Sequence, residues 1–311
     1  MGDVNRVLIT GASGFIGRAT VTAASEAGLE VVAVQRRPGA DRTGVSYVST
    51  DLTVRDSVGV LIDALQGCDA VIHLAAAMSG DPEDHKRLTV GGTEHLIEAM
   101  RQARTPHLTL ASSIAVFDTS QVPIGGDLTD DCPLENPAMS RDAYSGAKVR
   151  QENVARAARL NSLAILRPGI VYDNGQLWNA HLGVRLGPIL LRIGGDDPLP
   201  MCHVDRCAAA LVHATVHKVN NTFTVLDPAL PTRGRVITAL RRTGWPRLVV
   251  PVPWQVLWSS ARLLRPISTN LPGLLRENVL RQRVLPMGYR MKDPFGVDPL
   301  PDPSPDWRAA A

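Results

Sequence analysis

One segment near the start of the chain, VLITGASGFIG at positions 7–17, limits the possible folds more than any other feature. In it an apolar run of strand-forming residues passes through a turn with glycines at positions 11, 14 and 17 into a helical pattern. Such a strand, tight turn and helix points free backbone N–H groups and a helix N-terminus at a pyrophosphate. The spacing is G-x-x-G-x-x-G and not G-x-G-x-x-G, so the position of the turn between strand and helix carries the prediction.

A second motif, Tyr144-Ser145-Gly146-Ala147-Lys148, places a phenol and an ammonium four residues apart. On a helix this spacing puts both groups on one face. A tyrosine pKa near ~10 is too high for acid–base work at neutral pH, but a nearby cation stabilises the phenolate and lowers it. Isolated pairs of this kind are frequent on protein surfaces. Here, however, Ser112-Ser113 stand upstream at the end of an apolar strand pattern, and they add a third functional group.

The order of glycine turn, strand-end serine, tyrosine and lysine resembles the extended branch of the short-chain dehydrogenase/reductase superfamily, the NAD-dependent epimerase/dehydratase family. The resemblance covers most of the chain. It extends to Asp51-Leu52, to the segments 71–76 (VIHLAA), 112–117 (SSIAVF) and 166–172 (LRPGIVY), and to His203-Val204-Asp205. These matches follow one another in the family's order, so the resemblance does not rest on a single motif.

The resemblance implies a role for each member of the site. Tyr144 is the expected general acid/base, which protonates a ketone oxygen or deprotonates an alcohol. Lys148 is expected to hold the nicotinamide ribose and to lower the pKa of the phenol. Ser113, chosen over Ser112 by counting back from Val116-Phe117, is expected to hydrogen-bond the substrate oxygen. The implied cofactor site consists of Gly11, Ser13, Gly14, Phe15, Ile16, Gly17, Arg36, Arg37, Asp51, Leu52, Leu74, Ala75, Ala76, Pro168, Ile170 and Val171.

The residues after the second expected strand bear on cofactor choice. An acidic residue there would accept hydrogen bonds from an adenosine ribose 2′-OH and favour NAD. The chain instead has Gln35 followed by Arg36 and Arg37, whose guanidinium groups suit a 2′-phosphate. Arg18, directly after the turn, could add to them. We therefore expect NADP, with NAD as the alternative if these arginines are only solvated loop residues.

Strand and helix patterns alternate through the first two-thirds of the chain. Buried strands are predicted at 5–10, 30–34, 45–49, 69–74, 107–112 and 162–167, and helices at 15–27, 54–66, 83–104 and 143–160. We expect an α/β fold with a doubly wound parallel Rossmann sheet over 1–168, completed by segments at about 203–227.

A smaller substrate lobe is expected over 169–311. Helices are predicted at 203–217, 232–243 and 254–264, and a short strand at 222–226. From Leu285 onward the chain is rich in Pro, Asp and Gly, so we expect an extended and loosely held tail.

Departures from the family pattern narrow the predicted chemistry. Dehydratases carry an Asp-Glu pair after the catalytic hydroxyl, where this chain has Ile114-Ala115, and no Arg-Asp pair of the epimerases precedes His203. The segment around Trp254-Gln255-Val256-Leu257-Trp258 is apolar, through core packing or as a pocket lining. We therefore expect an oxidoreductase that interconverts a ketone and a secondary alcohol on a small, mostly apolar or glycosylated molecule.

Two alternatives remain open at this point. One is a sugar-nucleotide epimerase with tightly bound NAD. The other is a cofactor-binding regulator without turnover, because Thr89 occupies the place of the asparagine in the family's N-V-x-G-T pattern. A threonine can still donate and accept one hydrogen bond.

Composition excludes several other classes. The 311 residues are 44% apolar and 20% charged with a formal charge of +3, as is usual for a globular protein, and no basic block suggests nucleic acid. No apolar run reaches the ~18–20 residues of a membrane span, and no signal-peptide pattern opens the chain, so we expect a cytoplasmic protein. The family resemblance implies a homodimer that pairs the helices at 83–104 and 143–160.

The cysteines give no strong metal signal. Cys68, Cys132, Cys202 and Cys207 contain no C-x-x-C pair. Cys202, His203 and Cys207 lie close together in the sequence, with His213 and His217 one helical turn apart, but small cysteines packed at the start of a helix explain this pattern better than a metal site does. We predict no metal site.

Overall fold

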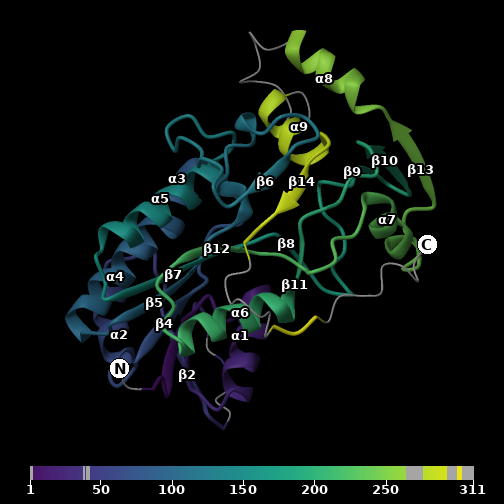
Figure 1. Cartoon of the computed structure of the whole chain (residues 1–311). Helices are drawn as coiled ribbons and strands as arrows, with labels where there is room; N and C mark the ends of the chain where they lie inside the picture. Colours follow the sequence, from purple (N-terminus) through teal and green to yellow (C-terminus); the bar gives the residue numbers. More distant parts are fainter. Residues whose placement is uncertain (1–2, 38, 40–42, 264–275, 293–299, 303–311) are drawn as a thin grey trace.

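Seven parallel strands form the central sheet, in the order β12-β7-β5-β4-β1-β2-β3 (Figure 1). The computed structural model describes residues 3–37, 39, 43–263, 276–292 and 300–302. The strands are β1 (Arg6–Thr10), β2 (Glu30–Gln35), β3 (Val45–Ser49), β4 (Ala70–His73), β5 (His107–Ala111), β7 (Ser162–Pro168) and β12 (Thr222–Val225). The strand order reverses between β1 and β4, and ligands of such sheets bind beyond the carboxyl ends of the strands at this point. The predicted doubly wound parallel sheet is confirmed.

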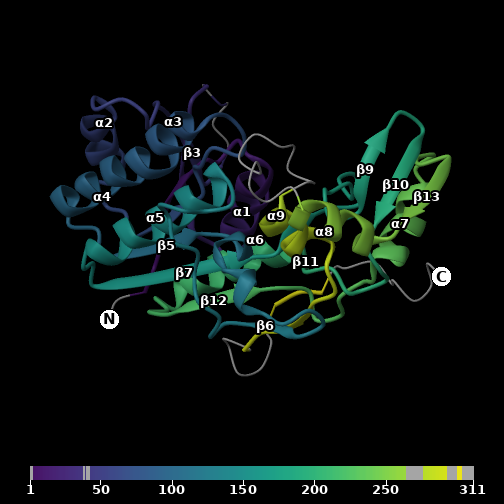
Figure 2. The same cartoon turned by 90° about the horizontal axis from the view of Figure 1, so that it is seen from above.

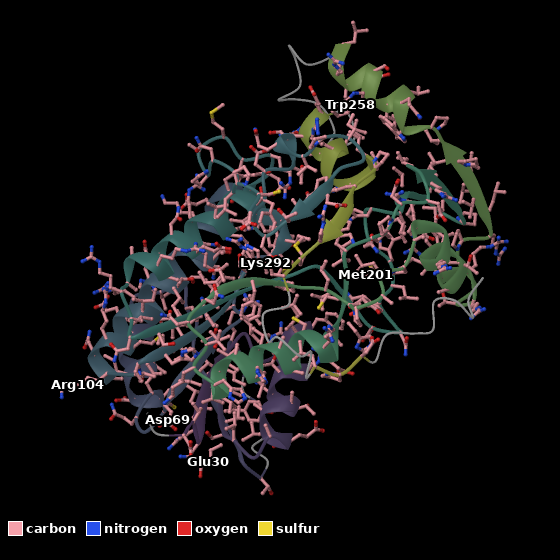
Figure 3. The ribbon with its side chains drawn as sticks, viewed as in Figure 1. Glu30, Asp69, Arg104, Met201, Trp258 and Lys292 are labelled. Carbon is pink, nitrogen blue, oxygen red and sulfur yellow. The ribbon has the colours of Figure 1, made fainter. Side chains whose placement is uncertain are left out.

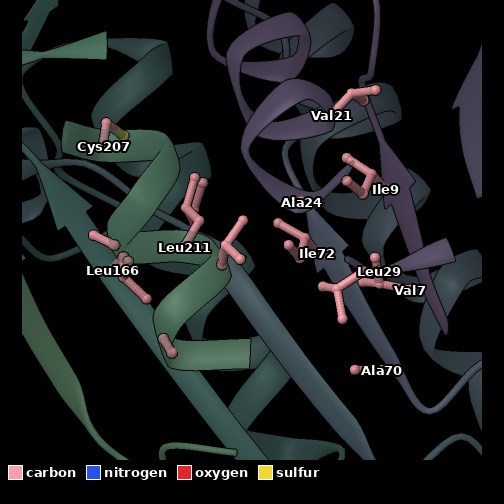
Figure 4. Packing of buried hydrophobic residues seen from close by; sticks show 14 of the residues in the cluster. Val7, Ile9, Val21, Ala24, Leu29, Ala70, Ile72, Leu166, Cys207 and Leu211 are labelled. Atoms are coloured by element: carbon pink, nitrogen blue, oxygen red, sulfur yellow. The ribbon is translucent and has the colours of Figure 1, made fainter. Parts of the chain in front are cut away.

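Helices cover both faces of the sheet, because alternate strand residues point to opposite sides. On one face, Val7 and Ile9 pack with Val21 of α1 and Leu211 of α6 (Figure 4). On the other face, Leu8 belongs to the core that includes α2, α4 and α5. These helices are α1 (Phe15–Glu26), α2 (Ser57–Ala64), α4 (Gly92–Ala103), α5 (Ala143–Ala157) and α6 (Val204–Val216).

A second, smaller lobe lies beyond the carboxyl ends of the strands. Glu30, Asp69 and Arg104 mark the opposite, amino-end side of the sheet, while Met201 and Trp258 lie toward the lobe (Figure 3). Strands β9, β10 and β13 and helix α7 gather at the end of the molecule remote from α2 and α4 (Figure 2). The elements here are β9 (Gly183–Leu186), β10 (Ile189–Ile193), β13 (Leu248–Val252), β8 (Ile170–Tyr172), β11 (Met201–His203), β6 (Asp127–Thr129), β14 (Gly288–Arg290), α7 (Arg233–Arg241), α8 (Trp254–Leu263) and α9 (Glu277–Val284).

The predicted single helix at 83–104 is in fact three consecutive helices. A short α3 (Pro82–Asp84) leads into a π-helix, η1 (His85–Gly91), and then into α4. Glycines 91 and 92 stand at the change of geometry, where they weaken the regular helix. A single wide turn of this kind is often found at functional sites. The π-helix packs against α5, which carries Tyr144 and Lys148.

The expectation of a loosely held tail from Leu285 is wrong for its first residues. Leu285 and Met287 are buried, and β14 pairs in parallel with β6. Further on, the Nη1 of Arg206 donates to the carbonyls of Leu300 and Pro301. The apolar side chains at the start of the segment supply the packing that its Pro-rich composition concealed. Residues 293–299 and 303–311, which hold most of the Pro-rich sequence, lie outside the described residues. Among the helices that are described, none has the length and hydropathy needed to cross a membrane.

A buried ion pair fastens α5 to the sheet. Glu152 is fully buried, and its carboxylate accepts from Arg167 Nε at 2.9 Å and Nη2 at 2.8 Å on β7. Ser112 Oγ donates to it at 2.5 Å and Arg156 Nη1 at 2.8 Å. Burial alone would raise the pKa of Glu152, but the bonds and charge of Arg167 bring it below its usual value. The carboxylate therefore stays charged inside the protein.

We expect Glu152→Gln to lower the free energy of unfolding by about 3–5 kcal/mol, because it leaves the Arg167 charge buried without its partner. Chemical denaturation measures this loss. Glu98→Gln is the matched control, since its bond with Arg55 is partly solvent-exposed and should contribute at most about 1 kcal/mol. Equal losses in the two variants would contradict the assigned role of Glu152.

Candidate active site

The glycine turn between β1 and α1 adopts a conformation that side chains would block. Gly11 has φ +68°, and a Cβ on it would lie 2.8 Å from the backbone nitrogen of Ala75. A Cβ on Gly17 would lie 2.1 Å from the carbonyl oxygen of Gly11. Gly14 is the N-cap of α1 and offers no side-chain cap. The turn thus brings the chain close to β4 and leaves the first N–H groups of α1 uncapped.

This geometry fits the diphosphate of a dinucleotide. The N–H groups of Phe15, Ile16 and Gly17 come before the first intrahelical hydrogen bond, so they are free to donate to an anion. The first turn of α1 carries no acidic residue. The exposed Ser13 belongs to the same turn, and its carbonyl oxygen accepts from Arg18 Nη1 at 2.8 Å. The Arg18 guanidinium therefore contacts the glycine turn itself.

The other predicted cofactor residues follow neighbouring strands of the sheet. Leu74, Ala75 and Ala76 follow β4 and are partly exposed. Ile170 and Val171 in β8 are also partly exposed, whereas Pro168 at the end of β7 is buried. Asp51 is exposed and Leu52 is buried in the segment after β3. Such residues meet at one edge of the sheet because all its strands run in parallel.

Arg36 and Arg37 lie exposed after β2, as the sequence places them. Within the described part of the chain, neither guanidinium makes a hydrogen bond or an ion pair. The backbone N–H of Thr53, with smaller contributions from the charges of Arg36 and Arg87, lowers the pKa of Asp51. Arg36 is thus close enough to Asp51 to act on its charge.

The two serines after β5 have different surroundings. Ser112 is buried and donates to Glu152, so its hydroxyl is engaged inside the protein. Ser113 is partly exposed at the start of η2 (Ile114–Val116), and its Oγ accepts from the Ala115 N–H at 3.1 Å. The Ser113 side chain also lies close enough to the Tyr144 phenol to lower its pKa. Ser113, and not Ser112, therefore faces the tyrosine.

Tyr144 lies in the first turn of α5, where Asp142 caps the helix by accepting from the Ser145 N–H at 2.8 Å. Burial raises the pKa of the phenol, and the nearby Ser113 side chain lowers it by less. The phenol is therefore protonated at neutral pH. Asp142 and Arg141 are the charges that act on it, and they do so in opposite directions.

Lys148 lies one helical turn further along α5 and is almost fully buried. Its Nζ donates to the Ala111 carbonyl at 2.8 Å and to Gln151 Oε1 at 2.9 Å. Burial lowers the pKa of Lys148 to about 8, against a smaller opposite effect of Glu152. The expectation that Lys148 lowers the phenol pKa is not met in this arrangement, because burial dominates at Tyr144 and the ammonium points to Ala111 and Gln151.

Three residues of the site escaped the sequence analysis. Gln151 is fully buried against Lys148, and its position three residues along the helix was the available signal. His85 on the π-helix meets the Tyr144 ring edge-on, with centroids 6.1 Å apart. Arg141 is buried, donates to Phe117 O at 3.4 Å and pairs with Glu135. No motif identified His85 or Arg141.

The second lobe approaches this site with basic residues. Arg233 of α7 donates from Nε to the His181 carbonyl at 2.9 Å and from Nη2 to the Arg283 carbonyl at 3.3 Å. Burial, together with the charges of Arg283, Arg233 and Arg141, lowers the pKa of His181 to about 3. Arg141 lies next to Asp142 and Tyr144 in the sequence, so His181 is close to the N-terminal end of α5.

The apolar residues of α8 pack within the lobe. Trp254, Leu257 and Trp258 contact the buried cluster around Leu280, and Val256 is exposed. Core packing therefore accounts for this segment.

Among the described residues, no cluster of three or more His, Cys, Asp or Glu side chains is arranged to hold a metal. Cys202 and Cys207 are both buried beside each other at the start of α6, and this contact and burial raise the pKa of Cys202.

Comparisons with known proteins agree with this geometry. The model of the NAD dependent epimerase/dehydratase family matches residues 7–222. Epimerase family protein SDR39U1 of Homo sapiens is 25% identical over 93% of this chain and 96% of its own length. The 3-diazoavenalumate denitrifying reductase of a Streptomyces species is 31% identical over 71% of this chain and 76% of its own length. The solved structure of MoeE5 in complex with UDP-glucose and NAD is 26% identical, has a TM-score of 0.63 and covers 81% of this chain and 85% of its own.

We expect substitution of Ser112 to lower the free energy of unfolding more than substitution of Ser113. Ser112→Ala removes a donor from the buried Glu152 carboxylate and should lower the free energy of unfolding by about 1–3 kcal/mol. Ser113→Ala should change it by less than about 0.5 kcal/mol, because its side chain is partly exposed. Urea denaturation of both variants tests this, and a greater loss for Ser113→Ala would reverse our assignment.

Proposed function

Because the chain belongs to the NAD dependent epimerase/dehydratase family, we propose that it is a nicotinamide-dependent ketoreductase. It interconverts a ketone and a secondary alcohol on a small, mostly apolar or glycosylated molecule. The observation that carries this proposal is that Ser113 lies close enough to the protonated phenol of Tyr144 to act on its pKa, with the Lys148 cation one helical turn away on α5. The glycine turn of α1 lies at the same edge of the sheet.

The residues divide the chemistry between them. The bound nicotinamide supplies hydride for reduction and accepts it in the reverse direction. Tyr144 donates its proton to the ketone oxygen, and its raised pKa keeps that proton in place at neutral pH. Ser113 hydrogen-bonds the same oxygen and stabilises the charge that develops on it. Lys148 would hold a ribose hydroxyl of the cofactor with its ammonium, which also donates to Ala111 and Gln151.

A sugar-nucleotide epimerase is the second candidate. It is favoured by the similarity to MoeE5, whose structure contains UDP-glucose and NAD. An epimerase uses the same tyrosine to oxidise and then re-reduce one carbon. The raised pKa of the phenol favours reduction, because the oxidation step needs the phenolate. The sequence also lacks the Arg-Asp pair that epimerases carry before His203.

The proposal includes NADP as the preferred cofactor. Arg36 and Arg37 lie exposed after β2, where the adenosine ribose binds in folds of this kind. Guanidinium groups suit the two negative charges and three acceptor oxygens of a phosphate.

The implied homodimer through 83–104 and 143–160 stays a prediction.

We expect Tyr144→Phe to lower kcat for ketone reduction by about 10²–10⁴-fold, because it removes the general acid. The affinity for the reduced cofactor should change little, since the phenol is not part of the glycine turn. Absorbance of the reduced nicotinamide follows turnover across a panel of ketones, and quenching of protein fluorescence follows binding. A fully active Phe variant would exclude Tyr144 as the acid.

The same assay separates the two candidate reactions. A ketoreductase consumes NADPH in proportion to the substrate that is converted. An epimerase converts its substrate with no net change in the cofactor. Conversion of a sugar nucleotide without NADPH consumption would replace our proposal by the second candidate.

We expect Arg36→Ala to weaken NADPH binding by about tenfold, because it removes a charge-assisted hydrogen bond to the 2′-phosphate. NADH binding should stay within about twofold of the wild-type value, since NADH has no phosphate there. Fluorescence titration with both cofactors measures the two constants. Arg241→Ala, an exposed arginine of α7, is the control. Equal effects on NADPH and NADH would remove the basis for NADP preference.

A further inference from the structure

Buried side-chain hydrogen bonds connect the glycine turn to Lys148 without interruption. Thr10, the last residue of β1, contacts His73 Nδ1 through its Oγ1 at 2.6 Å. His73 Nε2 contacts Thr93 Oγ1 at 2.9 Å, and Gln151 Nε2 donates to the same oxygen at 2.9 Å. Lys148 Nζ donates to Gln151 Oε1 at 2.9 Å. Each of these five side chains belongs to a residue that is at most 3% exposed, so water does not compete for the bonds.

The number of protons that each group can donate allows only one choice of donor and acceptor for each bond of this series. The Thr93 hydroxyl donates its single proton to the Thr89 carbonyl at 2.6 Å, so its oxygen accepts both from Gln151 and from His73 Nε2–H. Burial lowers the pKa of His73 to about 3, so the ring is neutral and its Nδ1 is an acceptor for Thr10. Since Gln151 Nε2 donates to Thr93, its Oε1 is the end that faces Lys148.

The Thr10 end of the series lies at the cofactor turn. The Thr10 oxygen accepts from the N–H groups of Leu74 and Ala75 at 3.3 and 3.4 Å. Ala75 is also the residue that Gly11 approaches most closely. The turn and the loop after β4 are thus held together at one end, and Lys148 is held at the other.

The Thr89 side chain does not hold Lys148, although Thr89 occupies the place of the asparagine in the family pattern. Its hydroxyl accepts from the Ala77 N–H at 3.0 Å, and its carbonyl accepts from Thr93. We propose that Gln151 is a positioning residue, whose carboxamide holds the Lys148 ammonium in place and ties it through Thr93 to the glycine turn. The inference rests on the proposed function only in taking Lys148 as the cation that holds the cofactor.

The charged groups around Lys148 make its titration a direct report on Gln151. Glu152 is engaged with Arg167, and His73 is neutral, so the direct partners of the ammonium are the neutral oxygens of Ala111 and Gln151. Loss of the Gln151 oxygen destabilises the charged amine and should lower the pKa of Lys148. A carboxylate in its place stabilises the charged amine and should raise that pKa. If Gln151 had a purely structural role, the two substitutions would not shift the pKa of Lys148 in opposite directions.

Competitive labelling with acetic anhydride, read by mass spectrometry over a pH series, tests this on the intact protein without turnover. The chain has four lysines, Lys86, Lys148, Lys218 and Lys292, so each is resolved and the exposed Lys86 and Lys292 are internal standards. In Gln151→Leu we expect the labelling midpoint of Lys148 to move to lower pH by about one unit, which is a tenfold change in its acid constant and does not depend on how fast the reagent reaches the amine. In Gln151→Glu its labelling midpoint should move to higher pH.

Gln102→Leu, the same change at an exposed position of α4, is the matched control and should leave the Lys148 midpoint unchanged. Thermal unfolding verifies that each variant is folded. If Gln151→Leu fails to fold, Gln151→Glu alone decides through the direction of its shift. Unchanged midpoints, or shifts of the same sign in both variants, would overturn the inference.

Activity separates this inference from the proposed function. If the wild type reduces ketones, Gln151→Leu should lower kcat and move the alkaline limb of its pH profile to lower pH. An altered Lys148 midpoint in a protein without ketone turnover supports the inference and counts against the proposed function. Ketone turnover by the wild type, together with unchanged Lys148 midpoints in the variants, supports the proposed function and counts against the inference.

Discussion

The geometry of the site depends on the buried Glu152 carboxylate, which joins α5 to the central sheet. Two bonds from Arg167, one from Ser112 and one from the partly exposed Arg156 satisfy it, while the carboxylate itself is buried. Removing charges from water is costly, so a pair of this kind stabilises only when its hydrogen bonds are complete. Because Tyr144 and Lys148 precede Glu152 on the same helix, the pair also sets how these groups meet the ends of β4 and β5.

A second constraint concerns the Lys148 cation. It contacts neutral oxygens, and the nearest carboxylate is already engaged with Arg167. Its charge is therefore fixed in position but is not neutralised by a direct partner. Burial lowers its pKa to about 8, so the ammonium persists at neutral pH. A cation held at the carboxyl end of β5 suits a ligand that brings hydroxyl groups and negative charge to this edge of the sheet.

The central sheet could be predicted from the sequence because its strands are continuous apolar runs, and each lies within one residue of its predicted place. Ser113, Tyr144 and Lys148 could be predicted because their motifs fall at strand ends or on the following helix. In the second lobe the helices predicted at 232–243 and 254–264 correspond to α7 and α8. Its short strands could not be predicted, since β8, β11 and β14 are three residues long and pair with distant segments. The π-helix at 85–91 was also missed, because helical periodicity does not distinguish it from an α-helix. The role of Gln151 could be assigned only from its hydrogen-bond partners in the structure, because its position on the helix does not show where its carboxamide points.

The relation between Tyr144 and Lys148 illustrates the limit of motif reasoning. Their spacing predicts a cation that lowers the phenol pKa, yet spacing on a helix does not specify where the ammonium points. In the folded protein the Ala111 carbonyl and Gln151 orient Nζ, and burial keeps the phenol protonated. A protonated phenol is the form that a ketone reduction consumes, whereas alcohol oxidation must first remove that proton. The direction of the Tyr144 pKa shift is the one expected if Tyr144 is the proposed acid and Lys148 acts through its position.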